Sequence, residues 1–258
     1  MSSGNDSIKK ILTVAFALCI VCSVVVSTAA IILKPAQQAN KSLDMKRNIL
    51  AAAGLLEEGR SVEEQFAGVS TRVVDLRTGR FTEDIEAAGY DQRKASKEAT
   101  NSDKLSADQD IAKIQRREHY SLVYLVQDNA GETDKIILPI RGYGLWSTLY
   151  GFIALESDTN TVAGLGFYDH GETPGLGGEV DNPRWKSLWP GKQVYRDGEV
   201  ALGLVKGAVD SSSPNASWEV DGLSGATLTA RGVTNLVQFW LGDEGFAPFL
   251  DNLRKGEA

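Results

Sequence analysis

The sequence predicts an α+β protein: one N-terminal transmembrane helix, then a soluble domain with a mainly antiparallel twisted sheet flanked by helices. Three observations predict this fold. Residues 11–33 contain no charged residue, short β-rich runs separated by turn signals fill residues 71–168, and two apolar helical segments close the chain.

The uncharged run is ILTVAFALCIVCSVVVSTAAIIL. At a rise of about 1.5 Å per residue, a helix of this length crosses a hydrocarbon core of about 30 Å. A cleaved signal peptide is the main alternative, because small residues occupy positions 27–30. The apolar part of a signal peptide is typically only about 7–15 residues long, so we expect an uncleaved membrane anchor.

The charges around the anchor do not decide its orientation. Lys9 and Lys10 precede it, whereas Lys34, Lys41, Lys46 and Arg47 follow it closely. Taken literally, the positive-inside rule favours an outside N-terminus, but a large following domain can translocate against such a bias.

Both cysteines, Cys19 and Cys22, lie inside the anchor. Three residues apart on a helix, they share a face. An iron–sulfur cluster usually takes four thiolates, so partner chains would have to supply the others. We therefore expect small packing residues rather than a shared metal site.

The rest of the chain is predicted in order. Residues 34–60 are predicted to form a polar linker with an amphipathic helix at 45–56. The predicted parts of the chain are therefore a tail (1–10), a transmembrane helix (11–33), this linker (34–60) and a soluble domain (61–258). Residues 82–107 are a polar surface excursion, partly mobile. Expected strands are 71–76, 120–127, 135–140, 149–156, 162–168 and 200–205, with a turn at 129–131, and expected helices are 182–185, 227–241 and 245–253.

Several classes of site are not supported. The net charge of −7 argues against nucleic-acid binding. His119 and His170 have no metal-ligand spacing, so no metal site is expected. The chain lacks a phosphate-binding P-loop, a dinucleotide-binding glycine pattern and a hydrolase triad, so we assign no catalytic residue.

Residues 221–229 read DGLSGATLT and stand where an apolar helix begins. Backbone N–H groups lack partners at a helix start, and anions bind there. The simpler explanation is a helix cap, because Ser and Thr are good capping residues. The spacing alone favours the cap.

Asp221, Ser224, Gly225, Ala226 and Thr227 together resemble the motif that a flavin transferase recognises in proteins carrying FMN on the final threonine. The segments GYGLWSTLYGFIAL (142–155) and HGETPGLG (170–177), with the N-terminal anchor, make the whole chain resemble the NqrC family of sodium-translocating NADH:quinone reductases. The RnfG family of Rnf-type electron-transfer complexes shares the HxETPGLG and SGAT motifs and is the nearest alternative.

The resemblance implies that Thr227 carries FMN through a phosphoester bond, with Ser224, Gly225 and Ala226 around it and Asp221 recognised by the transferase. The loop bearing Glu172, Thr173, Gly175, Leu176 and Gly177 would then hold the flavin ring. A plain turn with a rigid proline explains Pro174 and Gly175 but not the whole cluster.

Leu145 and Trp146 would form a second wall, although Trp146 is as credible as a core residue. Lys206 would place positive charge near the flavin, although a surface lysine is the commoner explanation.

The resemblance further implies an electron carrier in a multi-subunit NADH:quinone reductase of the inner membrane, with its soluble domain in the periplasm. Its partners would be the other membrane and peripheral subunits and, during maturation, the flavin transferase. The alternative from another functional class is a membrane-anchored assembly module that carries no redox cofactor.

Overall fold

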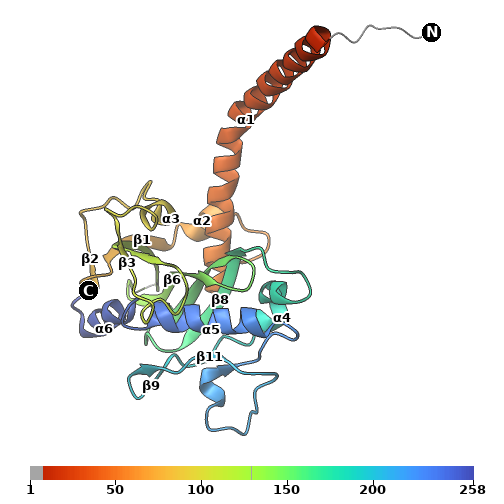
Figure 1. The fold of residues 1–258 in the computed structure, drawn as a ribbon. Coiled ribbons are helices and arrows are strands. Elements are labelled where there is room, and N and C mark those ends of the chain that lie inside the picture. The colour runs from red at the N-terminus through yellow and green to blue at the C-terminus, as the bar shows by residue number, and fades with distance from the viewer. Residues whose placement is uncertain (1–7, 129) are drawn as a thin grey trace. The chain divides into compact units, whose positions relative to one another are not determined.

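The computed structural model describes residues 8–128 and 130–258 and divides the chain into two compact units, 1–45 and 46–258. The helices in the described ranges are α1 (Ile8–Ala52), α2 (Val62–Phe66), α3 (Gln92–Ala95), α4 (Pro183–Lys186), α5 (Thr227–Leu241) and α6 (Ala247–Lys255) (Figure 1). Short 3₁₀ helices occupy Gly177–Asp181 and Ala216–Trp218. Most of the predicted tail and the predicted turn residue Asn129 lie outside the described residues.

Helix α1 contains the predicted membrane anchor. Its most apolar 18-residue window has a mean hydropathy of 2.7 and no buried residue. Among the helices of the described ranges, α1 is the one that is long and apolar enough to cross a membrane.

The predicted polar linker is wrong as a conformation, because α1 continues through Pro35 to Ala52. The residues after Pro35 are mostly good helix formers, and a proline within a long helix bends it more readily than it ends it. The helix ends at Ala52, and Gly54, two residues later, has a φ of +68°, which is a left-handed conformation.

The second unit is built on a six-stranded antiparallel sheet in the order β2-β1-β5-β6-β7-β8. This confirms the predicted fold class. The sheet strands are β1 (Val69–Asp75), β2 (Arg80–Phe81), β5 (Tyr120–Gln127), β6 (Thr133–Tyr143), β7 (Thr148–Glu156) and β8 (Val162–Asp169). The two-stranded pairs are β3 (Ser102–Lys104) with β4 (Arg116–Glu118), β9 (Tyr195–Arg196) with β10 (Glu199–Val200), and, in parallel, β11 (Gly203–Leu204) with β12 (Glu219–Val220).

The sheet is buried on both faces. On β6, Ile136, Leu138 and Ile140 belong to the main core together with Leu236 and Trp240 of α5, which runs across that face (Figure 1). The alternate residue Ile137 is also fully buried, outside that main core, as the two-residue period of a strand requires. The end of α1 lies close to the sheet, because a Cβ on Gly164 of β8 would stand 2.3 Å from the Ala52 carbonyl oxygen.

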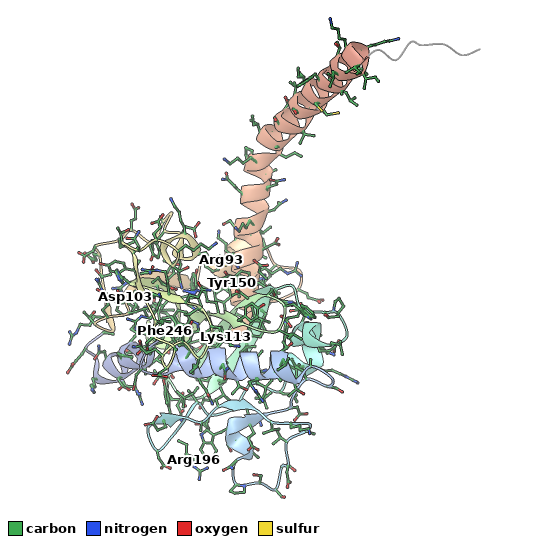
Figure 2. The ribbon with its side chains drawn as sticks, in the orientation of Figure 1. Arg93, Asp103, Lys113, Tyr150, Arg196 and Phe246 are labelled. Atoms are coloured by element: carbon green, nitrogen blue, oxygen red, sulfur yellow. The ribbon has the colours of Figure 1, made fainter. Side chains whose placement is uncertain are left out.

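The predicted surface excursion is tied to the sheet through Arg93 of α3. Its guanidinium carbon lies 3.6 Å from the centre of the Tyr150 ring, and its Nη1 pairs with Asp169 at 2.7 Å (Figure 2). Stacking on Tyr150 and the ion pair with Asp169, which lie on neighbouring strands, hold the middle of this polar segment against the sheet.

The predicted strand 200–205 is also corrected, since two short strands, β10 and β11, replace it. The backbone N–H groups of Ala201 and Leu202 both donate to the Val194 carbonyl, at 2.9 and 3.2 Å. This contact turns the chain between the strands and lets β11 pair with β12, next to the middle of α5 at Thr234.

Candidate functional site

The buried carboxylate of Glu172 joins three separate segments of the chain. Its Oε1 accepts hydrogen bonds from the backbone N–H groups of Leu145 (3.1 Å), Trp146 (3.0 Å) and Ser147 (3.2 Å). Its Oε2 accepts a 2.7 Å hydrogen bond from the Thr229 hydroxyl. The β6–β7 turn, the loop after β8 and the first turn of α5 are therefore held on one side chain.

These contacts keep Glu172 ionised. Burial alone raises the pKa of its carboxyl, but the hydrogen bonds from Thr229 and the three backbone N–H groups outweigh burial. The pKa therefore lies below its usual value, because these donors stabilise the carboxylate form.

Two glycines make room for the carboxylate. A Cβ on Gly144 would lie 2.6 Å from Glu172 Oε1, and a Cβ on Gly177 would lie 2.6 Å from Thr229 Oγ1. Side chains at these positions would displace the carboxylate or its partner, so both glycines serve close packing.

The loop after β8 is anchored at its start and turns sharply at its tip. The Gly171 N–H donates to Ser147 Oγ at 2.6 Å, and the Thr173 carbonyl accepts from the Gly178 N–H at 2.9 Å. Gly175 has a φ of +77°, which confirms the expected turn. Thr173, Gly175 and Leu176 remain exposed at the tip.

Helix α5 begins without a side-chain cap. Its N-cap residue is Ala226, which has no oxygen to offer, and Ser224 and Thr227 do not serve as the cap. The helix-cap explanation of the motif is therefore wrong. Thr227 is the first residue of the helix and is exposed, so its hydroxyl stands free beside uncapped backbone N–H groups.

Gly225 brings the motif against the loop tip. Its φ is +72°, and a Cβ there would lie 3.0 Å from Leu176 Cδ2. The predicted loop and the predicted motif therefore meet at the start of α5.

Large apolar side chains are exposed on the three segments that converge here. The exposed fraction is 66% for Trp146, 54% for Leu228, 45% for Leu176 and 40% for Tyr143. The alternative that Trp146 is a core residue is therefore wrong. Outside α1, Ile111 is the other large hydrophobic residue of the described ranges that is similarly exposed. Such a gathering of apolar side chains is typical of a binding surface.

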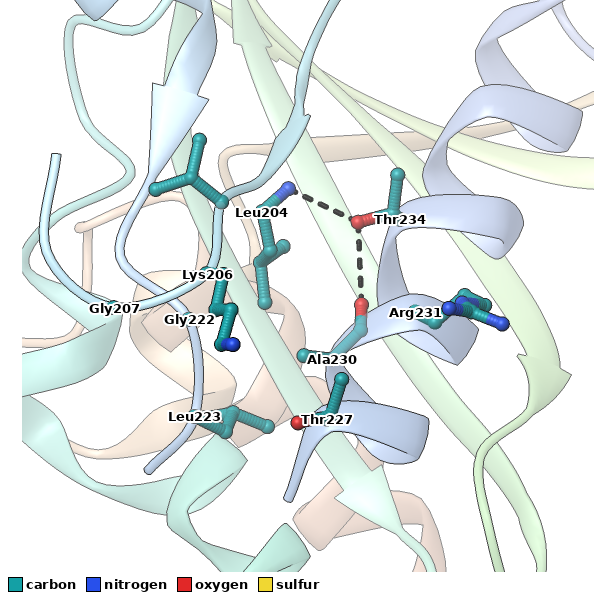
Figure 3. A pocket seen from close by; sticks show the side chains of 10 residues that line it. Leu204, Lys206, Gly207, Gly222, Leu223, Thr227, Ala230, Arg231 and Thr234 are labelled. Atoms are coloured by element: carbon teal, nitrogen blue, oxygen red, sulfur yellow. Dashed lines mark hydrogen bonds between the residues drawn. The ribbon is translucent and has the colours of Figure 1, made fainter. Parts of the chain in front are cut away.

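A cavity of about 250 Å³ opens between residues 204–207 and α5 (Figure 3). Thr227, Ala230, Arg231 and Thr234 line it from the helix, and Lys206 lines it from the loop. Thr234 joins the two walls, because its hydroxyl accepts from the Leu204 N–H at 3.0 Å and donates to the Ala230 carbonyl at 3.2 Å.

Asp221 holds the loop that carries Lys206. Its Oδ1 accepts a 2.8 Å hydrogen bond from the Val209 N–H, and its carbonyl accepts from Trp185 Nε1 at 2.9 Å. Next to it, the Gly222 N–H donates to the Gly207 carbonyl at 2.8 Å. The residue expected to be recognised by a transferase thus also positions this loop.

The structure brings nearly all predicted site residues together around the start of α5. It adds Thr229 and Arg231, which the sequence reasoning missed. Thr229 belongs to the quoted motif, but nothing in the sequence pairs it with Glu172. Arg231 lies four residues after Thr227, one helical turn along, and this spacing was the available signal.

The histidines and cysteines weighed above as metal ligands have the following surroundings. In the part of the chain that the structure describes, no group of three or more His, Cys, Asp or Glu side chains is placed to hold a metal ion. Cys19 and Cys22 are exposed on α1. His119 and His170 pair with Asp103 and Asp181, at 3.1 and 2.9 Å.

Comparison with known proteins gives consistent relatives. The FMN-binding domain family matches residues 144–242. The C subunit of the Na(+)-translocating NADH-quinone reductase of Pseudomonas aeruginosa is 55% identical over 261 residues, covering 99% of this chain and 100% of the relative. The corresponding C subunit of Vibrio alginolyticus is 50% identical over 259 residues, covering 100% of this chain and 99% of the relative.

Solved structures agree with these relatives. The crystal structure of Shewanella oneidensis NqrC matches with a TM-score of 0.78 and 39% identity, over 84% of this chain and 99% of that one. The crystal structure of the C subunit of the Na(+)-translocating NADH-quinone reductase from Parabacteroides distasonis matches with a TM-score of 0.66 and 28% identity, over 84% and 96%.

Proposed function

Because the chain belongs to the NqrC family, the C subunits of Na(+)-translocating NADH-quinone reductases, we propose that it holds FMN through a phosphoester bond to Thr227 and relays electrons within such a complex. It is thus one subunit of an oxidoreductase, and FMN is its cofactor. The observation that carries the attachment site is the exposed hydroxyl of Thr227 at the uncapped start of α5.

The residues around Thr227 have the charge and the apolar surface that the phosphate and the ring of FMN require. A phosphate diester is an anion, and uncapped helix N–H groups with two nearby cations, Lys206 and Arg231, suit an anion. The exposed side chains of Leu176 and Trp146 offer apolar surface to a flat aromatic ring.

FMN supplies reversible electron acceptance when it is bound. The chain's own residues hold and orient the group. In this proposal Thr227 carries the FMN, and Ser224, Gly225 and Ala226 shape the backbone that leads to it. Glu172 keeps the β6–β7 turn and the tip of the loop after β8 in position around Thr227. Leu145, Trp146, Thr173, Gly175, Leu176 and Gly177 belong to the segments that frame the ring.

The proposal extends to assembly and location. Residues 11–33 would anchor the chain in the inner membrane, and residues 61–258 would form the FMN-binding domain on the periplasmic side. A flavin transferase would recognise Asp221 and attach the FMN. Membership of the family implies further subunits as partners.

Two alternatives are less well supported. The Pseudomonas, Vibrio and Shewanella relatives all bear the name of the NqrC family, which favours it over the RnfG family. The assembly-module alternative relied on a motif that only caps a helix, and the N-cap is Ala226.

Substitution of Thr227 tests the proposal. The chain is co-expressed with a flavin transferase, denatured, and examined for flavin fluorescence on a gel. We expect a fluorescent band for the wild type and for Ser211→Ala, which removes an exposed hydroxyl outside the motif, and none for Thr227→Val. A Thr227→Val band that keeps its flavin would assign the bond to another residue, and a colourless wild type would favour the non-redox alternative.

A further inference from the structure

The cavity beside Thr227 carries an inference that rests on the proposed function and goes beyond it. We propose that Lys206 and Arg231 form a two-sided cationic clamp on the FMN phosphate at Thr227, with the cavity receiving the phosphate and the adjoining sugar-alcohol chain. The flavin ring then lies outside the cavity, by the exposed apolar residues.

Both cations are unpaired in the structure. The Lys206 ammonium and the Arg231 guanidinium have no hydrogen bond, ion pair or aromatic contact with any residue in the described ranges. By contrast, Arg77, Arg93, Lys135 and Arg141 each pair with a carboxylate. Two unpaired cations on one cavity create a local positive field in a chain whose net charge is −7.

The two cations belong to different elements that line the same cavity as Thr227. Arg231 lies four residues along α5, so the two Cβ atoms share a face of the helix. Figure 3 shows the Arg231 guanidinium extending outward from α5, and rotation about its side-chain bonds would carry it back toward the turn that holds Thr227, because side chains on a helix lean toward its N-terminus. Lys206 comes from the loop after β11, across the cavity (Figure 3).

The loop that carries Lys206 is held in place by backbone contacts. Asp221 Oδ1 accepts from the Val209 N–H, and the Gly222 N–H donates to the Gly207 carbonyl. A Cβ on Gly222 would lie 2.2 Å from the Val205 carbonyl oxygen, so the loop packs directly on the motif. Lys206 is therefore fixed at its backbone beside Thr227.

The size of the cavity limits what it receives. At about 250 Å³, it falls below the roughly 300–1,000 Å³ of pockets that enclose a whole drug-sized ligand. Part of FMN fits there, and the polar part matches the two cations. The exposed Leu176 and Trp146 do not line the cavity and are left for the flavin ring.

The test compares FMN with riboflavin, which has the same ring but no phosphate. Full-length Thr227→Val protein in detergent cannot form the ester at residue 227, and its binding of each flavin is followed by fluorescence quenching. The clamp predicts tighter binding of FMN than of riboflavin at low ionic strength. In the Lys206→Met/Arg231→Met double variant of this chain, the FMN affinity should fall about tenfold, while riboflavin binding stays unchanged. Each single variant should lose part of that preference.

The matched control is Lys97→Met/Lys104→Met in the same background. It removes the same charge from exposed lysines that do not line the cavity, and it should keep the FMN preference. Equal affinity for both flavins, absence of FMN binding, or a preference that survives the double variant would overturn the inference. The proposed function is tested separately, by the fluorescence of covalently bound flavin on a gel of chains that retain Thr227.

Discussion

The hydroxyl of Thr229 donates a 2.7 Å hydrogen bond to Oε2 of Glu172, a residue 57 positions earlier in the chain. Both side chains are buried, and the other carboxylate oxygen collects three backbone N–H groups from the β6–β7 turn. One side chain thus fixes the start of α5 relative to two loops. The residue proposed to carry the cofactor stands two positions before Thr229.

Replacing Glu172 should destabilise the chain by an amount that depends on what remains to accept hydrogen bonds. Glu172→Gln keeps one carbonyl oxygen for the N–H groups, and its amide can donate to the Thr229 hydroxyl, so we expect a loss of about 1 kcal/mol. Glu172→Leu leaves the donors without a partner and should cost about 3 kcal/mol. Chemical unfolding of the full chain in detergent measures both. The exposed control Glu58→Gln should change nothing, and equal losses for the two Glu172 variants would contradict the assigned contacts.

The same carboxylate should give a pH-dependent difference between the wild type and Glu172→Gln. The pKa of Glu172 is lowered from 4.5 in the folded state, so the stabilisation is fully present above about pH 4.5. It is lost as the pH falls through the lowered folded pKa. The difference in the free energy of unfolding should therefore be constant near neutrality and shrink in acid. A difference that grows toward low pH would mean that the carboxylate is not stabilised by these donors.

Thr229 should behave as a specific partner of Glu172. Thr229→Val preserves shape but leaves a buried carboxylate oxygen without its donor, and should cost about 1–2 kcal/mol. It should also raise the pKa of Glu172 toward its usual value. Thr229→Ser keeps the hydroxyl and should lose much less. In a double-mutant cycle with Glu172→Gln, the two losses should not add, whereas additive losses would show that the residues act independently.

Two glycines of β8 offer a matched test of how the end of α1 packs. A Cβ on Gly164 would lie 2.3 Å from the Ala52 carbonyl oxygen, while one on Gly166 would meet only the Ala52 Cβ, at 3.9 Å. We expect Gly164→Ala to cost about 1–3 kcal/mol through overpacking and Gly166→Ala to be nearly neutral. Unfolding of both variants in parallel checks this, and equal stability would contradict the close approach.

The sheet was predictable because its signals are local. Residues 120–127 and 162–168 alternate or concentrate β-formers between turn residues, and β5 and β8 appear there with bounds that differ by one residue at most. Helix α5 has the predicted bounds because its apolar period is clear. The polar linker was predicted wrongly, because α1 continues through Pro35 and the residues after it favour a helix.

The site was predictable only as a set of motifs. Glycines and hydroxyls indicated where the chain bends, but not that Glu172 accepts from a turn 25 to 27 residues earlier. Such a partner depends on strand register, which no single segment encodes. Trp146 shows the same limit, since a tryptophan close to glycines carries no local sign of being exposed.

The two roles of Asp221 can be separated by comparing Asn with Ala. Asp221→Asn keeps an oxygen that accepts from the Val209 N–H, so the loop carrying Lys206 should stay ordered. Asp221→Ala removes it, and amide exchange at Val209 should become about fivefold faster, as expected for a lost hydrogen bond of about 1 kcal/mol.

If the transferase recognises the carboxylate, as we propose, flavin attachment to Thr227 should fall strongly in both variants. Asp210→Asn, an exposed neighbour in the same segment, should keep it. Normal attachment in Asp221→Asn with loss in Asp221→Ala would instead show that Asp221 acts by placing the loop, because only the hydrogen bond to Val209 differs between the two.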